Sequence, residues 1–193
     1  LPTGTRRLPE SVNAVTSTGS ADLTVQLPET AGHVDLSLFD GYLVIQSNHI
    51  VLERVEVSGT QTLTINGTDG ADNFRIDLDQ SGDLNFDSIV VHGYGDDDDI
   101  VLDGVPNLFA GSLSIDGGNG NDRIEVRGGQ RTSLTLGGAD GNDTLFGGMG
   151  AETIDGGAGD DMLFGGSGND RVNGGTGNDL IQGNTGDDTL VGN

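Results

Sequence analysis

Residues 138–191 read GADGNDTLF, GGMGAETID, GGAGDDMLF, GGSGNDRVN, GGTGNDLIQ and GNTGDDTLV, which are six nine-residue words with no insertion between them. Every word has glycine at its first and fourth positions, an acid at its sixth and an apolar residue at its eighth. Strict repetition at a fixed period is the sequence signature of a repeat architecture. This stretch therefore decides the fold, and the rest of the chain is interpreted outward from it.

Each word predicts a tight turn followed by a very short strand. Glycines at positions one, two and four can adopt positive φ angles that other residues avoid, so the first six residues can turn sharply. In the last three residues, alternation directs the central apolar side chain to one side of the strand. Two words complete a circuit of 18 residues, and stacked circuits form two facing parallel sheets with strands about 4.8 Å apart. The inward residues are Leu145, Ile154, Leu163, Val172, Ile181 and Leu190.

The sixth-position acids of alternate words stack in two columns. Like charges a few ångströms apart repel unless a cation lies between them. In addition, the aliphatic core is too thin to offset the loss of backbone entropy on folding, which is about 1–2 kcal/mol per residue. Hard oxygen ligands without thiolates or histidines favour calcium, which takes six to eight oxygens. The sequence therefore predicts calcium held by carboxylates and by carbonyls of the glycine turns. One column contains Asp143, Asp161 and Asp179, and the other contains Glu152, Asp170 and Asp188.

The upstream chain carries the same unit at wider spacing. Residues 63–76, 89–102, 113–126 and 134–147 align without gaps as LTINGTDGADNFRI, IVVHGYGDDDDIVL, LSIDGGNGNDRIEV and LTLGGADGNDTLFG. Their acids Asp72, Asp98 and Asp122 lead into Asp143 by steps of 26, 24 and 21 residues, before the steps of 18 begin. We therefore predict one solenoid that tightens toward its C-terminus, with calcium along one edge over six circuits.

Several positions depart from the pattern. Tyr94 and Asp96 stand where it requires glycine, and so do Ala139 and Asn184, while Glu152 replaces aspartate. The site that uses Glu152 is expected to be filled less readily than the others at full coordination. The acids of the upstream turn that do not stand at the sixth position, Asp96, Asp97 and Asp99, are interpreted as solvated turn residues.

The tandem words resemble the RTX family, the calcium-binding nonapeptide repeats of secreted bacterial proteins. The resemblance is close over residues 138–191. It implies an all-β, right-handed parallel β-roll, a β-solenoid whose ions lie between turns 18 residues apart, held by sixth-position acids and carbonyls of the glycine region. We expect about seven Ca²⁺ ions, five on the long edge and two on the short. The expected metal positions are Asp72, Asp98, Gly117, Gly120, Asp122, Gly138, Asp140, Asp143, Gly147, Glu152, Gly156, Gly159, Asp161, Gly165, Gly168, Asp170, Gly174, Gly177, Asp179, Gly183 and Asp188.

The chain divides into four predicted segments. Residues 1–20 are expected to form an extended arm or cap, 21–62 a strand-rich part of the solenoid without calcium turns, 63–137 the wide calcium circuits and 138–193 the nonapeptide β-roll. Alternation predicts strands at 23–27, 34–38, 42–45 and 51–57. Two hypotheses stay open there: Asp40 and Gly41 close a hairpin, or residues 50–74 belong to a further pair of wide circuits.

Composition agrees with an extracellular calcium protein. Thirty-one acids against eight arginines and no lysine give a net charge of -23. That charge disfavours nucleic acid and anionic membrane surfaces as partners, and it makes the metal-free chain repel itself. Cysteine is absent, so a secreted chain of this kind would be held by metal rather than by disulfides. No apolar run approaches the roughly 18 residues of a membrane span, so membrane insertion is not expected.

Functional motifs of common enzymes are missing from the sequence. It contains no HExxH, GxSxG, Walker or CxxC motif, and its histidines, His33, His49 and His92, fall in different predicted strands. We therefore expect no enzyme activity. Two functions compete: an extracellular structural protein that builds a fibre, surface layer or matrix, and a calcium-binding module of a larger secreted enzyme or adhesin.

Two surfaces are candidates for self-association. Head-to-tail stacking of solenoid ends would build a homo-polymer, because a parallel roll exposes unpaired backbone at its ends. The outward residues of one sheet include Phe146, Met162, Phe164 and Leu180. This stripe is either a lateral contact site or a cross-strand ladder that stabilises the stack, and the sequence favours neither.

Overall fold

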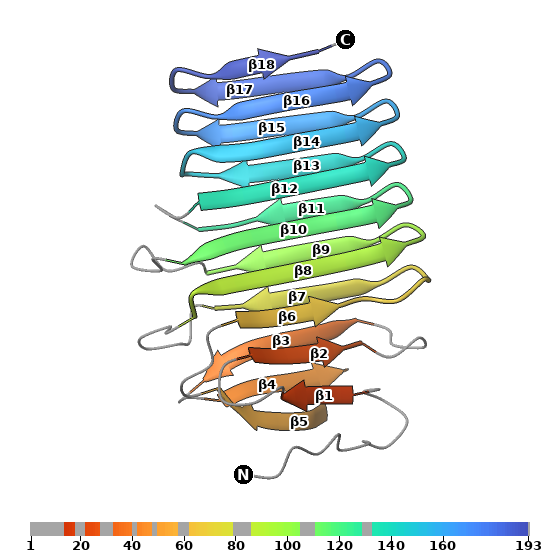
Figure 1. The fold of residues 1–193 in the computed structure, drawn as a ribbon, viewed down its shortest axis with the longest axis vertical. Coiled ribbons are helices and arrows are strands. Elements are labelled where there is room, and N and C mark those ends of the chain that lie inside the picture. Colours follow the sequence, from red (N-terminus) through yellow and green to blue (C-terminus); the bar gives the residue numbers. More distant parts are fainter. Residues whose placement is uncertain are drawn as a thin grey trace.

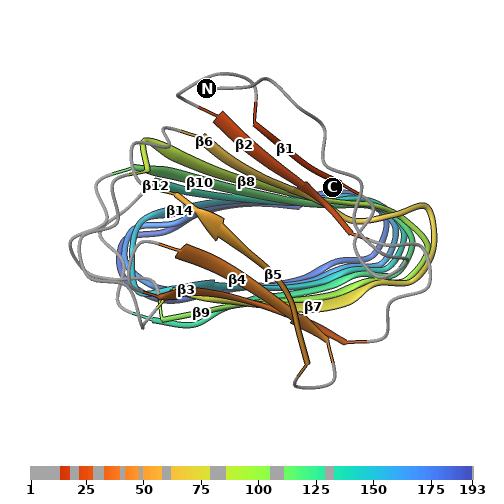
Figure 2. The same ribbon diagram turned by 90° about the horizontal axis from the view of Figure 1, so that it is seen from below.

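The computed structural model describes residues 14–17, 22–27, 33–39, 42–47, 50–57, 62–78, 86–104, 111–128 and 133–192. In these ranges every regular element is a β-strand, and the strands form two nine-stranded sheets that lie face to face (Figure 1, Figure 2). A helix long and apolar enough to cross a membrane is not found among these residues. The fold is the all-β parallel solenoid that the repeat predicts.

Consecutive strands of the chain belong alternately to the two sheets over most of the molecule. Sheet A has the order β1 (Ala14–Ser17), β2 (Asp22–Gln26), β6 (Thr62–Asn66), β8 (Ser88–Gly95), β10 (Ser112–Asn119), β12 (Ser133–Asp140), β14 (Glu152–Ala158), β16 (Arg171–Thr176) and β18 (Thr189–Val191). Sheet B has the order β17 (Leu180–Thr185), β15 (Met162–Ser167), β13 (Thr144–Gly148), β11 (Arg123–Val126), β9 (Asp99–Asp103), β7 (Asn73–Asp77), β3 (Val34–Phe39), β4 (Tyr42–Ser47) and β5 (Ile50–Glu56).

Strand pairing is parallel from β2 to β18 in sheet A and from β3 to β17 in sheet B. Leu63 lies beside Ile89, which lies beside Leu113, and Leu113 lies beside Leu134. From Thr153 the partner is 18 residues further on, at Arg171. The same turn position therefore recurs at the same edge in each circuit, which sets the sixth-position acids directly above one another.

The inward side chains form one continuous aliphatic core between the sheets. Leu145, Ile154, Leu163 and Val172 are almost completely buried, as the repeat predicts. Ile181 is only partly buried and Leu190 is 47% exposed. Their exposure is greater than predicted because β17 and β18 are the outermost strands of the two sheets at this end.

The strands are longer than the three residues expected from each word. β14 runs from the acid Glu152 to Ala158, the third residue of the next word, and β15 runs to the equivalent Ser167. Pairing continues through these positions, with Gly157 beside Gly175 and Ala158 beside Thr176. The expectation was wrong because backbone pairing between circuits extends the strand into the glycine pair.

Positive φ angles occur at the second and fourth positions of the repeat in all the described turns except those of Asp72 and Glu152. Among the described residues, the non-glycine positions with positive φ are Tyr94 (85°), Asp96 (68°), Ala139 (79°) and Asn184 (70°). These four residues stand where the pattern requires glycine, so the alignment of the upstream turn of Asp98 with the tandem words is confirmed; Thr68, at the second position of the turn of Asp72, does not have positive φ. First-position glycines do not have positive φ, which corrects the expectation for that position.

The N-terminal end departs from the parallel stack. β1 pairs antiparallel with β2, and β3, β4 and β5 pair antiparallel in sequence order. The strands expected at 23–27, 34–38, 42–45 and 51–57 are present as β2 to β5. The antiparallel β4–β5 pair contradicts a further pair of wide circuits and leaves the hairpin hypothesis, although Asp40 and Gly41 lie outside the described residues. So do residues 1–13 and 18–21, most of the expected arm, and His49.

Candidate metal centre

Two columns of acidic side chains follow the turns at opposite edges of the roll. The turns from sheet A to sheet B form the right-hand side in Figure 1 and carry the long column, and the turns from sheet B to sheet A carry the short one. The long column contains Asp72, Asp98, Asp122, Asp143, Asp161 and Asp179, and the short column contains Glu152, Asp170 and Asp188. All of them except Asp179 and Asp188 are at most 5% exposed, so the turns bury a line of carboxyl groups.

One oxygen of each carboxylate after the first in a column holds the circuit before it. The backbone N–H of Asp143 donates to Oδ1 of Asp161 at 2.8 Å, and that of Asp161 donates to Oδ1 of Asp179 at 3.1 Å. The same bond joins Asp72 to Asp98 at 2.8 Å and Glu152 to Asp170 at 2.9 Å. It persists where the circuits widen to 26 and 24 residues. We call this series the inner ladder.

The second oxygen of most of these acids has no hydrogen-bond partner although it is buried. It is the Oδ2 atom of Asp98, Asp122, Asp143, Asp161, Asp170 and Asp179. A buried acceptor without a partner costs about 1–3 kcal/mol, and more when it is charged. These oxygens are the atoms that a bound cation would satisfy.

Each of these Oδ2 atoms lies against the first-position glycine of its own turn. A Cβ built on Gly138 would overlap Oδ2 of Asp143 and lie 2.5 Å from the carbonyl oxygen of Gly156 in the next circuit. Likewise, a Cβ built on Gly156 would overlap Oδ2 of Asp161 and lie 2.6 Å from the carbonyl oxygen of Gly174 in the next circuit. The first-position glycines are therefore required for space, which leaves a cradle lined by oxygen. The buried glycines among the predicted sites that meet their acid in this way are Gly117, Gly138, Gly156, Gly165, Gly174 and Gly183, whereas at Gly147 the carboxylate of Glu152 is 3.2 Å from a built Cβ.

The electrostatics of the columns favour a cation. Burial raises the pKa of Asp98 and Asp143 to about 7, with a further increase from the neighbouring carboxylates of the column. Burial likewise raises the pKa of Asp122 and Asp161, although a backbone N–H donor opposes the rise in each. A raised pKa means that the protein environment disfavours the ionised form. Positive charge in the cradle would reverse that preference.

A second ladder, which the sequence analysis missed, runs outside the first. Oδ1 of Asp97 accepts the N–H of Asn121 at 2.7 Å, and Oδ1 of Asn121 accepts the N–H of Asn142 at 2.9 Å. The series continues through Asp160 and Asn178. Its bonds run in the opposite direction to the inner ladder, because here the downstream backbone donates to the upstream side chain. The signal was available in the sequence, since Asp or Asn stands at the fifth position of five of the six tandem words.

This outer ladder corrects the interpretation of the upstream acidic turn. Asp97 is exposed, but its carboxylate is bonded to both the backbone and the side-chain amide of Asn121, which lowers its pKa. Asp99 forms an ion pair with Arg123 at 3.4 Å. Both side chains are solvent-accessible, as expected, but each also has a partner in the next circuit that the sequence analysis did not predict.

The remaining predicted site residues support the turn backbone. The fourth-position glycines have φ between 131° and 141°; they are Gly120, Gly159, Gly168 and Gly177. The N–H of Gly159 donates to the carbonyl of Thr176 at 2.8 Å, and that of Gly120 donates to the carbonyl of Asp140 at 2.8 Å. The side chain of Asp140 is exposed and lies outside the buried column. Fourth-position glycines thus tie consecutive turns together.

The donor set fits a hard cation. Within the described ranges, no three acidic or histidine side chains converge on one point, so a bound ion must take much of its coordination from glycine-turn carbonyls. Oxygen ligands in large number and flexible geometry are those of calcium. Bound calcium would supply the positive charge that the buried carboxylates lack. Fold and site together define a calcium-binding parallel β-roll.

Comparison with known proteins agrees with this class. The protein-family model of the RTX calcium-binding nonapeptide repeat (four copies) matches the sequence at residues 114–132, 135–163 and 164–193. The chain therefore contains RTX calcium-binding repeats. Searches of curated proteins and of solved structures each gave no significant match.

The matched residues begin upstream of the tandem words but do not reach the first two turns of the long column. Asp72 and Asp98 lie outside the match, yet both belong to the inner ladder. The Oδ2 of Asp98 is buried and unpartnered, like those of the matched repeats. A Cβ at Gly93 would overlap it and the carbonyl oxygen of Gly117. The site geometry therefore continues beyond the recognisable repeat.

Proposed function

We propose that this chain is a secreted, calcium-stapled structural rod without enzyme activity, which associates head-to-tail into a fibre, surface layer or matrix. RTX calcium-binding repeats, which are typical of secreted proteins, support the calcium dependence and the extracellular setting. The observation that supports self-association is the exposure of the apolar residues Leu180, Leu190 and Val191 on β17 and β18. The alternative is a calcium-binding module of a larger secreted enzyme or adhesin, in which further circuits would cover these residues.

The end strands have the features of an interface. β18 and β17 are outermost in their sheets, and their apolar residues Leu180, Leu190 and Val191 are 51%, 47% and 39% exposed. At the other end of the stack, the outermost strands are β1 and β5. A head-to-tail contact would pair the edge of β18 with β1 of a second copy and the edge of β17 with its β5. Such a heterologous contact does not close and so propagates into a filament.

Filament formation is tested by electron microscopy of the protein with calcium and with chelator. We expect filaments or sheets in millimolar calcium and none in chelator, because the end circuit is a template for pairing only when it is folded. Leu190→Asp, which places a carboxylate in the open core end, should abolish filaments while leaving the folded monomer. Dispersed particles in calcium would refute polymerisation and would leave the module of a larger protein as the better hypothesis.

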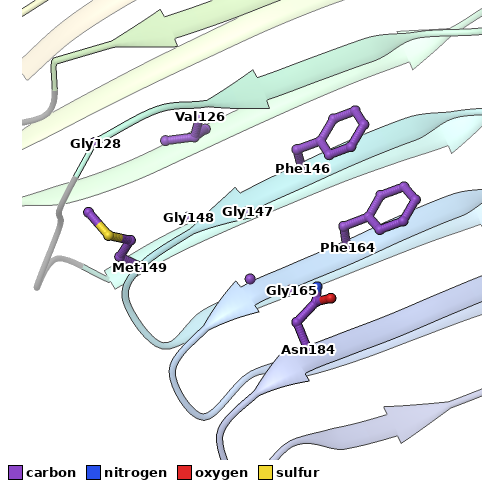
Figure 3. A pocket seen from close by; sticks show the side chains of 10 residues that line it. Val126, Gly128, Phe146, Gly147, Gly148, Met149, Phe164, Gly165 and Asn184 are labelled. Carbon is purple, nitrogen blue, oxygen red and sulfur yellow. The ribbon is translucent and has the colours of Figure 1, made fainter.

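The outward stripe on sheet B supports a lateral contact as well. Phe146 and Phe164 stack with ring centroids 4.8 Å apart, and the guanidinium of Arg123 lies 5.3 Å from the Phe146 centroid. Met162 is 44% exposed and lies beside Leu180 in the next strand. A groove of about 430 Å³ beside the two phenyl rings is lined by Gly147, Gly148, Met149 and Gly165. Figure 3 shows how the labelled side chains lie along it. The stacking also agrees with a stabilising ladder, so the two hypotheses require an experiment.

The double variant Phe146→Ser and Phe164→Ser separates them. If the stripe is a lateral contact, the mass of the assembly measured by light scattering should fall while thermal stability in calcium changes little. A ladder predicts the opposite, with unchanged mass and a loss of roughly 0.5–1.5 kcal/mol for the aromatic pair. Thr144→Ser, on the same strand and face, is the matched control.

A further inference from the structure

The first acid of each column differs from the buried acids that follow it. Oδ2 of Asp72, which opens the long column, accepts the backbone N–H of Thr68 at 2.6 Å. Glu152, which opens the short column, accepts the N–H of Gly150 on Oε1 at 2.9 Å and that of Gly148 on Oε2 at 3.3 Å. In these two turns the carboxylate closes on the backbone of its own turn.

The oxygen-lined cradle is altered at Glu152, and at Asp72 the oxygen that faces it already has a partner. In the turns of Asp98, Asp143 and Asp170, a Cβ on the first-position glycine would overlap the unpartnered Oδ2. At Gly147 the nearest oxygen of Glu152 is 3.2 Å from such a Cβ, because the longer side chain reaches back to the turn N–H groups. At Gly67 the Oδ2 of Asp72 is 2.5 Å away, but it already has its donor in Thr68.

Neighbouring residues lock the first turn of the long column without metal. Thr68 stands at the second position, which is glycine in four of the six tandem words. Its hydroxyl donates to the carbonyl of Gly70 at 3.0 Å, and the N–H of Gly70 donates to the hydroxyl at 3.2 Å. In the short column, Ala151 at the fifth position has no side-chain oxygen for an outer ladder. Both opening turns are thus built differently from those after them.

We propose that Asp72 and Glu152 are metal-independent caps that begin the two calcium columns, and that only the acids after them hold ions. This inference rests on the proposed calcium binding and revises the assignment of Asp72 and Glu152 as ligands. Acids with an open Oδ2 offer a full carboxylate charge to a cation. In the caps, backbone N–H groups of the same turn already donate hydrogen bonds to the carboxylate oxygens, so a cation is not needed to satisfy them. One ion for each acid after the cap keeps the total at about seven. The acids assigned to ions are Asp98, Asp122, Asp143, Asp161 and Asp179 on the long edge and Asp170 and Asp188 on the short edge.

The test counts bound calcium by native mass spectrometry in saturating calcium. Four isosteric variants form two matched pairs: Asp72→Asn with Asp98→Asn on the long column, and Glu152→Gln with Asp170→Asn on the short one. We expect Asp72→Asn and Glu152→Gln to bind as many ions as the unaltered chain, and Asp98→Asn and Asp170→Asn to lose at least one each. Circular dichroism in calcium checks that each variant is folded.

Anomalous diffraction from calcium in crystals of the unaltered chain gives the same answer if a variant does not fold. Ions should contact the carboxylates of Asp98 and Asp170, and none should contact those of Asp72 or Glu152. An ion on either cap, or an ion lost by Asp72→Asn or Glu152→Gln, would overturn the inference while leaving calcium binding intact. An unaltered chain that binds no calcium would overturn both proposals.

Discussion

Removal of calcium by a chelator is expected to unfold at least residues 138–191, with loss of the β-sheet circular dichroism signal. Among the residues that the structure describes, six buried Oδ2 atoms have no hydrogen-bond partner, and the columns set carboxylates above one another at each circuit. Without a cation, ionised carboxylates there are both desolvated and mutually repelled, and the net charge of -23 adds to the repulsion. Metal binding energy is therefore much of the folding energy of the roll.

The measurement is a chelation and calcium titration followed by circular dichroism. Refolding should require calcium in the range of about 0.1–1 mM that is typical of extracellular modules. Magnesium is the control ion, and it should restore little signal, because it requires near-octahedral geometry and retains its waters. A spectrum that does not change after calcium has demonstrably left the protein would show that the aliphatic core and the two ladders suffice.

Gly159→Ala is expected to destabilise the calcium-loaded roll strongly, whereas Gly70→Ala at the same repeat position is not. Gly159 has φ 141°, and a Cβ there would overlap the carbonyl oxygen of Gly141. A non-glycine residue in such a conformation costs roughly 1–3 kcal/mol before any overlap with backbone is counted. The tight circuit leaves no room for relief, because Gly159 donates its N–H to Thr176 in the next circuit.

Gly70 also stands at the fourth position, but in the first turn of the wide circuits. Its φ is outside the left-handed region, and the nearest atom to a built Cβ is Oγ1 of Thr68 at 3.8 Å. Gly70→Ala should therefore leave stability unchanged or raise it by up to about 1 kcal/mol, through the lower entropy of the unfolded chain. Urea unfolding in saturating calcium compares the two variants. Equal midpoint shifts would contradict the assignment of Gly159 to a strained, close-packed turn.

Much of the fold was predictable from the sequence because each nine-residue word contains the residues that set its own turn and strand. The eighth-position residues Leu145, Ile154, Leu163 and Val172 are buried as expected. The positive φ at the second and fourth positions was predicted correctly for most turns, including the one in which Tyr94 and Asp96 replace glycine, but not for the turns of Asp72 and Glu152. A period repeated without insertion leaves only one register in which the acids of residues 138–191 stack, and the gap-free alignment of the upstream turns extended the long column to Asp72.

Other features could not be predicted because they depend on contacts between circuits. The first-position glycines have ordinary φ, and their small size is required by the carboxylate beside them and by the carbonyl of the next circuit. Strand length was underestimated because pairing between circuits extends into the glycine pair, as between Gly157 and Gly175. The antiparallel β3–β4–β5 pairing also needed the structure, since alternation alone is the same in a hairpin and in a circuit.

The sequence by itself determined the period, the solenoid and the oxygen-only chemistry of its turns, because these are local properties that every word repeats. Tertiary structure decided which groups the two oxygens of each carboxylate contact. In most turns one oxygen accepts the N–H of the previous circuit and the other stays open, as in Asp161. In Asp72 and Glu152 the second oxygen is closed by the turn itself. That difference depends on where neighbouring backbone places its N–H groups, which only the stacked circuits fix.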